Sequence, residues 1–231
     1  MVNAPIIVPV PEEAQNPDRR RLKRIGDAVR ERLAANPAVY ALPCDGAELF
    51  AVGDFLSPEE CTRLIAMIDA VARPSRAFDA DYASGYRTSY SGDPDPADPF
   101  VRRIQRRIDD LLGMEPDRGE TVQGQRYLPG QQFQAHTDWF PANTDYWAAE
   151  RSRGGQRSFT CMCFLNKVEE GGHTAFPHLG LSIEPKPGAL LAWNNADRDG
   201  VPNPLTLHAG LPVVRGVKYI VTKWYRARRW A

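Results

Sequence analysis

A histidine and an aspartate spaced two residues apart are the residues of this sequence that most directly suggest chemistry. His136 and Asp138 follow a Pro129-Gly130 turn, in a segment whose polar and apolar residues alternate as in a β-strand. Side chains two apart on a strand point to the same side, so this imidazole and this carboxylate can reach one metal ion. With a second histidine they would form the facial triad that holds non-haem Fe(II). Without a second histidine, the pair is better explained as a buried histidine that is hydrogen-bonded to a nearby carboxylate.

A second histidine stands in the C-terminal third of the chain. His208 lies in a short predicted strand at 205–209. Strands this distant in sequence can lie opposite one another in a jelly-roll barrel, which would bring His208 to the same ion as His136 and Asp138. Taken alone, His208 is equally well explained as a hydrogen-bonded core histidine.

The last predicted strand, at 217–226, carries a lysine among apolar residues. Alternation places Lys218 on one face together with Ile220, Thr222 and Trp224. If this face points inward, the ammonium group needs an anionic partner, because an unpaired buried charge is costly. If it points outward, Lys218 is simply solvated. The strand pattern leaves both orientations open.

Helical patterns occupy the N-terminal half. The first begins at Asn16-Pro17 and ends near 36–37, and we interpret its basic face as solvated because no aromatic residues interleave it. The second begins after Ser57, where Glu60 completes a capping box. The third follows a loop-rich segment at 74–99. The residues expected to face the core are Leu22, Ile25, Val29 and Leu33, then Leu64, Ile65, Ile68 and Val71, then Val101, Ile104, Ile108 and Leu111.

From residue 120 onward the sequence changes to short strands separated by Gly, Pro and Asn, and 48–55 adds an earlier strand. This pattern predicts a mainly β protein with flanking helices (α+β), in which a double-stranded β-helix, or jelly roll, packs against N-terminal helices. Phe133 and Ala135 should face away from His136. The later strands are predicted at 121–128, 132–138, 157–166, 173–176, 180–184, 188–194, 205–209 and 217–226.

We divide the chain into an N-terminal arm at 1–16 and a single catalytic domain at 17–231. Residues 17–119 would supply helical support and a substrate loop, and residues 120–228 the jelly-roll core with the metal site. A length of 231 residues is compatible with one such domain.

Charge and composition exclude several partners. Lys and Arg together number 29, as do Asp and Glu, so no overall positive field recruits nucleic acid or an anionic membrane. No apolar segment is long enough to cross a bilayer, and we expect a cytoplasmic protein. Cys161 and Cys163 alternate along an apolar strand and are expected in the core. We predict no disulfide and no zinc ribbon for them or for Cys44 and Cys61.

Several motifs in order give the segment from Tyr86 to Trp224 a family resemblance. It resembles the catalytic domain of the prolyl 4-hydroxylase α-subunit family, within the 2-oxoglutarate and Fe(II)-dependent dioxygenases. Each motif is weak alone, but their joint order is specific. They are Arg87-Thr88-Ser89, Arg126-Tyr127-x-x-Gly130-Gln131, His136-x-Asp138, Phe164-Leu165-Asn166-x-Val168-Glu169-Glu170-Gly171-Gly172-x-Thr174-x-Phe176-Pro177, Lys186-x-Gly188-Ala189-Leu190, and His208-Ala209-Gly210 followed by Lys218.

The resemblance implies a set of roles. His136, Asp138 and His208 would hold Fe(II), and Lys218 would pair with the distal carboxylate of 2-oxoglutarate. Tyr127 and Thr160 match positions that help to hold the same co-substrate. The residues matching segments near a peptide groove or lining the pocket are Tyr86, Arg87, Trp139 and Trp224.

The implied reaction is hydroxylation of a peptidyl proline, with O2 as co-substrate, release of succinate and CO2, and stimulation by bound ascorbate. A peptide or protein is then the expected partner, while the oligomeric state is not predicted. His173 departs from the family, which often has Glu there, and we interpret both His173 and His178 as surface groups.

Three alternatives remain open at this stage. The same cofactor chemistry could act on a free amino acid or a small metabolite. The barrel could instead be a catalytically silent binding module. A cupin-like hydrolase or isomerase using Zn or Mn would be active without any 2-oxo acid.

Overall fold

The strands of the molecule form two facing sheets and a short two-stranded ribbon. The computed structural model describes residue 16 and residues 18–75 and 85–230. The strands in this part of the chain are β1 Val39–Ala41, β2 Leu49–Val52, β3 Arg73–Pro74, β4 Tyr90–Ser91, β5 Gln123–Tyr127, β6 Phe133–His136, β7 Arg157–Phe164, β8 Glu170–Gly171, β9 Thr174–Phe176, β10 Leu181–Ile183, β11 Leu190–Asn194, β12 His208–Gly210, β13 Val213–Arg215 and β14 Lys218–Arg226.

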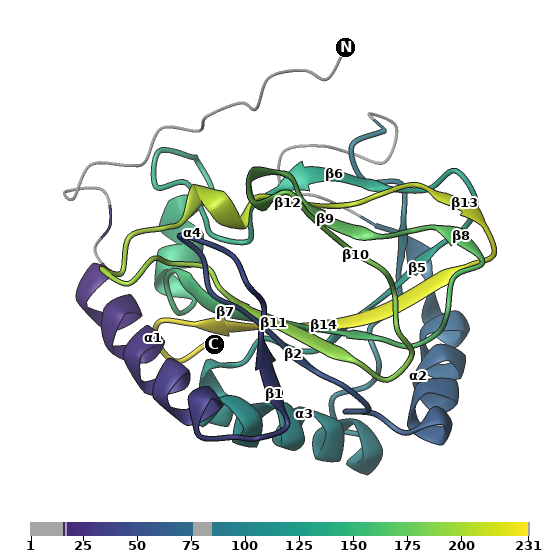
Figure 1. Cartoon of the computed structure of the whole chain (residues 1–231), viewed down its shortest axis with the longest axis horizontal. Coiled ribbons are helices and arrows are strands. Elements are labelled where there is room, and N and C mark those ends of the chain that lie inside the picture. The colour runs from purple at the N-terminus through teal and green to yellow at the C-terminus, as the bar shows by residue number, and fades with distance from the viewer. Residues whose placement is uncertain (1–15, 17, 76–84, 231) are drawn as a thin grey trace.

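The sheet order is that of a double-stranded β-helix. An eight-stranded sheet runs β1-β2-β11-β7-β14-β5-β4-β3, a four-stranded sheet runs β10-β9-β12-β6, and β13 pairs with β8. Neighbouring strands are antiparallel, as in the pairs of β14 with β7 and of β12 with β6. Figure 1 shows the smaller sheet lying over the larger one. The predicted jelly-roll architecture is confirmed.

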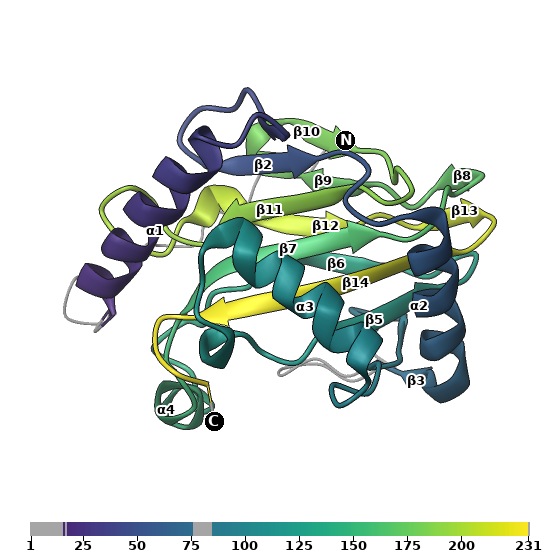
Figure 2. The same cartoon turned by 90° about the horizontal axis from the view of Figure 1, so that it is seen from below.

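Three helices cover the outer face of the larger sheet (Figures 1 and 2). They are α1 Arg19–Ala34, α2 Pro58–Val71 and α3 Pro99–Leu112, and a short helix, α4 Trp147–Ser152, lies between β6 and β7 in sequence. The predicted capping box starts α2, since the Ser57 hydroxyl accepts from the Glu60 N–H and the Glu60 carboxylate accepts from the Ser57 N–H. No helix among the described residues is both long and apolar enough to span a bilayer.

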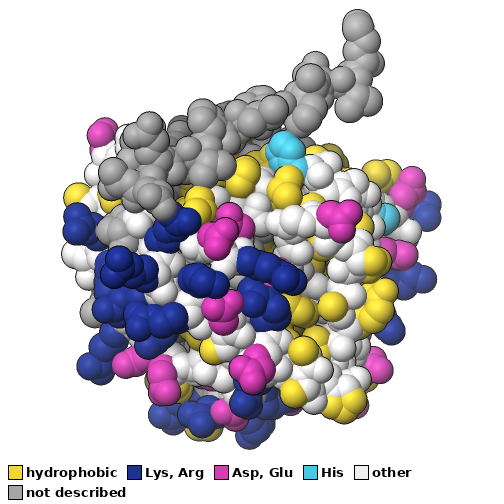
Figure 3. All heavy atoms as spheres, turned by 60° about the vertical axis from the view of Figure 1, so that its left-hand side comes forward, with side chains coloured by type: hydrophobic (Ala, Val, Ile, Leu, Met, Phe, Trp, Pro, Cys, Tyr) yellow, Lys and Arg dark blue, Asp and Glu magenta, His cyan; other side chains and the backbone are white. Residues whose placement is uncertain are grey.

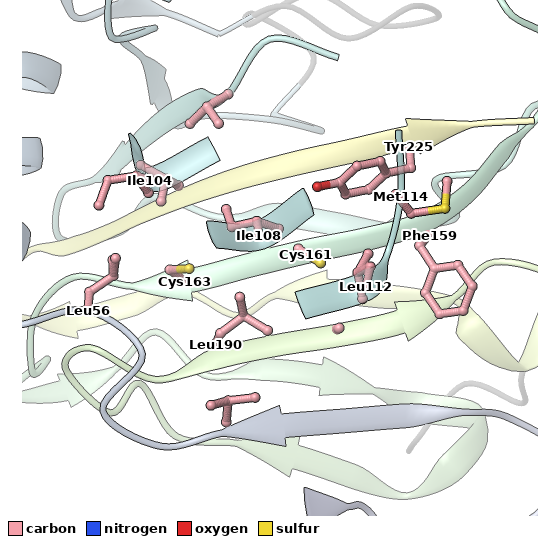
Figure 4. Packing of buried hydrophobic residues seen from close by; sticks show 14 of the residues in the cluster. Leu56, Ile104, Ile108, Leu112, Met114, Phe159, Cys161, Cys163, Leu190 and Tyr225 are labelled. Carbon is pink, nitrogen blue, oxygen red and sulfur yellow. The ribbon is translucent and has the colours of Figure 1, made fainter. Parts of the chain in front are cut away.

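Alternation along β7 divides the apolar interior into two clusters. Cys161 and Cys163 face the helices, where they pack with α3 residues such as Ile104 and Ile108 (Figure 4). Met162 belongs to the other cluster, between the two sheets. The four cysteines are free, as predicted. The larger sheet is thus a wall between the helical layer and the interior of the barrel.

Several boundaries differ from the sequence prediction. The strand predicted at 132–138 ends at His136, and the segment predicted as a strand at 205–209 is a 3-10 turn at Pro204–Thr206 followed by β12. Val71 is 46% exposed, so it does not belong to the buried stripe of α2. Residues 17–119 also contribute β1, β2, β3 and β4 to the larger sheet, and are therefore more than helical support. Of these strands, β2 lies within the strand predicted at 48–55, whereas β1, β3 and β4 have too few residues to show a period of two.

Two predicted segments cannot be compared with the structure. The arm at 1–16 lies outside the described residues except for Asn16, and so do residues 76–84 of the loop-rich segment at 74–99.

Candidate metal centre

Two histidines and an aspartate meet at one end of the interior of the barrel. Ligand atoms of His136, Asp138 and His208 all lie within 4.8 Å of one another, and within the described ranges no other group of His, Cys, Asp or Glu forms such a cluster. His136 ends β6 and pairs directly with His208 at the start of β12. Asp138 lies in the bend that follows β6. The three residues that the sequence predicted as metal ligands are therefore brought together.

The pairing of β6 with β12 changes register next to His136 and His208. His136 pairs with His208, whereas Phe133 pairs with Gly210, so two residues of β6 stand opposite Ala209 alone, as in a β-bulge. The bulge brings Phe133 and His136 to the same side, and their rings stack with centroids 3.6 Å apart. The predicted alternation, with Phe133 facing away from His136, is wrong at this point.

Backbone carbonyls orient both imidazoles. Nδ1 of His136 lies 2.8 Å from the Gln134 carbonyl, and Nδ1 of His208 lies 3.0 Å from the Thr206 carbonyl. A carbonyl can only accept, so each Nδ1 carries the proton and each Nε2 keeps a lone pair for a metal. Burial and the neighbouring His208 lower the pKa of His136 to about 3, which keeps this imidazole neutral.

The carboxylate of Asp138 is held from the opposite sheet. The Thr160 hydroxyl donates to Asp138 Oδ2 at 2.7 Å and accepts from Asn195 Nδ2 at 2.9 Å. Nη1 of Arg157 lies 3.9 Å from Oδ1. Burial alone would raise the pKa of Asp138, but His208, His136, Arg157 and the Thr160 hydroxyl together lower it below its ordinary value. The group is therefore a carboxylate anion, the form in which an aspartate binds a metal.

A buried lysine lies in the same cavity. Lys218 is 1% exposed, donates to Thr174 Oγ1 at 3.2 Å, and has its Nζ 5.4 Å from the centre of the Tyr127 ring. Burial lowers its pKa from 10.5 to about 7. It forms no ion pair with any residue that the structure describes. The face of β14 that carries Lys218 points inward, which is the orientation that calls for an external anion.

The cavity between the two sheets joins the histidines to this lysine. Its lining comes from both sheets and includes Tyr127 and Trp224 as the sequence predicted. Trp193 and Trp224 each have a buried indole N–H without a hydrogen-bond partner in the described part of the chain. Unpaired buried donors are costly, and a polar ligand in the cavity could satisfy them. The residues present thus fit a divalent metal and an anionic co-substrate. The lining residues are Gln125, Tyr127, Phe133, His136, Asp138, Met162, Thr174, Trp193, His208, Gly210, Lys218, Ile220, Thr222 and Trp224.

Other predicted site residues are placed differently. Thr160 contacts Asp138 and does not line the cavity, so its position fits orientation of a metal ligand rather than contact with the co-substrate. Trp139 is 2% exposed and donates its indole N–H to the Asn203 carbonyl. Both side chains are therefore buried, Thr160 against the Asp138 carboxylate and Trp139 against the Asn203 backbone.

Tyr86 and Arg87 both contact Phe133, whose ring in turn stacks on the ring of His136. The Tyr86 ring meets the Phe133 ring edge-on at 5.8 Å, and the Arg87 guanidinium lies 4.7 Å from the centre of the same ring. Arg87 is buried and donates to Gln123 Oε1 at 2.8 Å. Tyr86 is the more accessible of the two.

Sequence reasoning missed four residues that shape the site. The alternating pattern places Phe133 on the wrong face, gives no role to Arg157 or Asn195, and includes Thr174 only as part of a motif. Arg157 forms a bidentate pair with Glu120 at 2.6 and 2.7 Å and lies 4.2 Å from the centre of the Trp224 ring. Only Thr174 had a sequence signal, since it follows the Gly171-Gly172 turn of a recognised motif.

The two remaining histidines lie apart from the metal ligands. Nδ1 of His173 lies 3.0 Å from the Ser182 hydroxyl, and neither His173 nor His178 joins the metal-ligand cluster.

Comparisons with known proteins agree with this geometry. Residues 122–226 match the 2OG-Fe(II) oxygenase superfamily. Prolyl 4-hydroxylase 2 of Arabidopsis thaliana is 30% identical over 216 residues, which cover 82% of this chain and 70% of that protein. The crystal structure of the viral collagen prolyl hydroxylase from Paramecium Bursaria Chlorella virus-1, a 2OG complex, has a TM-score of 0.61 and 30% identity, and the match covers 79% of this chain and 98% of that chain.

A more distant structure shares the fold. The prolyl hydroxylase of Trichoplax adhaerens, in complex with a hypoxia inducible factor oxygen degradation domain peptide fragment, has a TM-score of 0.59 at 15% identity. That match covers 90% of this chain and 91% of the other. At this identity it speaks for the architecture alone.

Proposed function

The chain belongs to the 2OG-Fe(II) oxygenase superfamily, as a member of its prolyl 4-hydroxylase-like branch, and from this premise we propose that it hydroxylates a proline within a peptide or protein. The observation that carries the proposal is a single cavity with His136, Asp138 and His208 at one end and buried Lys218 at the other. A histidine and carboxylate triad suits Fe(II), and a buried ammonium group suits the distal carboxylate of 2-oxoglutarate.

The chain's own residues bind and orient the reactants. His136, Asp138 and His208 would hold Fe(II), with Nε2 of each imidazole and one Asp138 oxygen as donors. Lys218 and Thr174 would hold the distal carboxylate of 2-oxoglutarate, and the apolar walls would exclude water. Bound Fe(II) supplies the oxidative chemistry, in which 2-oxoglutarate, O2 and a C–H bond become succinate, CO2 and a hydroxylated product.

A peptide substrate is supported by the named relatives and by the residues at the metal end of the cavity. Tyr86 packs edge-on against Phe133, and Trp224 stacks with Arg157. The Tyr86 and Trp224 rings are partly exposed, and such aromatic surfaces suit the ring of a proline. The alternatives of a free amino acid, a small metabolite or a silent module have no comparable support. Ascorbate as a reductant and a cytoplasmic location stay predictions from the sequence.

The test is succinate formation from 2-oxoglutarate with added Fe(II) and a proline-containing peptide. A matched peptide with Ala in place of Pro is the control. We expect succinate and a hydroxylated peptide only with the proline peptide. Equal turnover with both peptides, or turnover with free proline alone, would contradict a peptidyl prolyl substrate. Turnover without any 2-oxo acid would contradict the whole assignment.

A further inference from the structure

A second hollow lies far from the metal centre, between α1 and α3. It encloses about 1030 Å³ and shares no lining residue with the cavity between the sheets. Figure 2 shows the two helices side by side on the outer face of the larger sheet. We call this hollow the α1–α3 groove. It is lined by Arg21, Arg24, Ile25, Ala28, Val29, Glu31, Arg32, Ala35, Asn36, Pro37, Asp110, Leu111, Leu112, Gly113, Met114, Arg118 and Ala227.

Small residues keep the groove open. Ala28 of α1 and Ala35, which follows that helix, line it on one side. Gly113 follows α3, and its φ of 67° is favourable only for a residue without a side chain. A Cβ on Gly113 would lie 2.7 Å from Cδ of Arg32. Arg32 uses this space to cross from α1 and to donate from Nη2 to the Asp110 carbonyl at 2.6 Å. This hydrogen bond joins the two helices near the C-terminal end of α3, and the groove lies between them.

The floor of the groove is apolar and its rim is basic. Ile25, Val29 and Met114 form part of the floor, and the Arg21, Arg24 and Arg118 side chains stand around it. None of these three arginines has a hydrogen bond or ion pair from its side chain to any other residue within 18–75 or 85–230. Figure 3 shows Lys and Arg side chains gathered on the face of the molecule that carries α1.

Two acidic residues also line the groove, but they do not cancel this charge. The Asp110 carboxylate is paired with Arg106 at 3.0 Å, which leaves Glu31 to oppose the three rim arginines. Arginine stems pack on apolar groups while their heads pair with carboxylates. A groove of this kind complements a ligand that carries both apolar and acidic groups.

We propose that the α1–α3 groove docks an acidic amphipathic segment of a protein partner. Its carboxylates pair with Arg21, Arg24 and Arg118, and its apolar side chains enter between the helices. Nucleic acid fits less well, because no aromatic side chain lines the groove to stack on a base and Glu31 would repel a phosphate. The proposal does not depend on the chemistry of the metal centre.

The test uses the full chain and a fluorescein-labelled helical peptide that presents Glu on one face and Leu on the other. Fluorescence anisotropy should show binding that weakens with added salt. Reversing the rim charges in Arg21→Glu/Arg24→Glu should weaken binding by about tenfold or more, equivalent to about 1.4 kcal/mol. The matched control is Arg20→Glu/Arg102→Glu, which makes the same change of charge on two exposed arginines outside the groove. The control should bind like the unmodified chain.

Further readouts separate this proposal from the proposed enzyme activity. Turnover of a short proline peptide should be the same in the rim variant as in the unmodified chain, and circular dichroism should show that both variants fold. The proposal is overturned if the unmodified chain does not bind the acidic peptide, or if both variants lose binding equally. It is also overturned if a labelled single-stranded oligonucleotide, or a peptide with Lys in place of Glu, binds more tightly than the acidic peptide.

Discussion

The hydroxyl of Thr160 lies 2.7 Å from Oδ2 of Asp138 and so joins the larger sheet to a candidate metal ligand that follows β6 of the smaller sheet. Asp138 stands beyond the end of β6, where no strand pairing holds it. Its carboxylate is oriented instead by Thr160, which Asn195 supports in turn. Residues that orient a metal ligand in this way affect the metal without touching it.

We expect Thr160→Val to weaken binding of Fe(II) or Co(II) by about 10- to 100-fold, because the carboxylate loses its hydrogen bond and its fixed orientation. Valine keeps the shape of the side chain and replaces the hydroxyl with a methyl group. Thr160→Ser restores the hydroxyl and should bind metal nearly as well as the unmodified chain. Titration with Co(II), followed by its visible absorption, measures both variants. Equal affinity in Thr160→Val would mean that the hydrogen bond has no role in orienting Asp138.

His136→Ala should abolish metal binding and turnover, since two ligands hold the ion poorly. A ligand that binds the folded state raises its stability, so added Co(II) should raise the melting temperature of the unmodified chain but not that of the variant. The control is His173→Ala, which removes a histidine that lies outside the cluster. A rise in melting temperature that survives in His136→Ala would remove this residue from the site.

Lys218→Ala should raise the concentration of 2-oxoglutarate required for half-maximal turnover by about 10- to 100-fold, the worth of a charge-assisted hydrogen bond. Binding of Co(II) should persist, because Lys218 is not a ligand. Lys186→Ala, at an exposed lysine outside the cavity, is the control and should leave the requirement unchanged. If Lys218→Ala needs no more 2-oxoglutarate than the unmodified chain, then another residue pairs with the distal carboxylate.

The same lysine predicts a dependence on pH. Burial lowers the pKa of Lys218 to about 7 from 10.5, so in the ligand-free protein it loses its charge as the pH rises through about 7. Only the charged form pairs with a carboxylate. Affinity for 2-oxoglutarate should therefore fall as the pH rises above about 7, and binding should take up a proton. Calorimetric titration in buffers with different ionisation enthalpies measures this uptake, and Lys218→Met should lack it.

Lys218 affects folding stability in the opposite direction: the affinity for 2-oxoglutarate should fall as the pH rises, whereas the free energy of unfolding should rise. Between about pH 7 and 10.5 the unfolded chain binds more protons at Lys218 than the ligand-free folded chain does. This group therefore makes the free energy of unfolding rise with pH across that range. Chemical denaturation of the unmodified chain and of Lys218→Met isolates the contribution. Parallel pH profiles of the two proteins would contradict a lowered pKa of Lys218 in the folded chain.

A buried ion pair between the larger sheet and α3 predicts a stability effect remote from the site. Lys223 Nζ donates to Asp109 Oδ1 at 2.5 Å, and the Tyr225 hydroxyl donates to the same oxygen at 2.6 Å. Lys223→Met should cost about 3–5 kcal/mol in urea denaturation, because Asp109 stays buried without its cation. The double variant Lys223→Met/Asp109→Leu should recover much of this loss. An additive loss in the double variant would contradict the argument.

Much of this protein follows from local rules that a sequence displays. The capping box at Ser57, the helical spacing of Leu22 and Val29, and the alternation along β7 depend only on neighbours in the chain, and the structure confirms each. The types of the candidate ligands, and the order of the motifs around them, also indicate an oxygenase from the sequence alone.

Tertiary structure decided what a local pattern leaves open. Alternation shows that Lys218 and Trp224 share a face, but the packing of β14 between β7 and β5 determines that this face points inward. The bulge that turns Phe133 toward His136 exists because β6 pairs with β12, a strand far along the chain. The Thr160 contact to Asp138, the burial of Trp139 and the α1–α3 groove likewise arise between distant segments. A sequence specifies which side chains can point the same way, whereas only the packing of distant elements selects the direction and the neighbours that meet there.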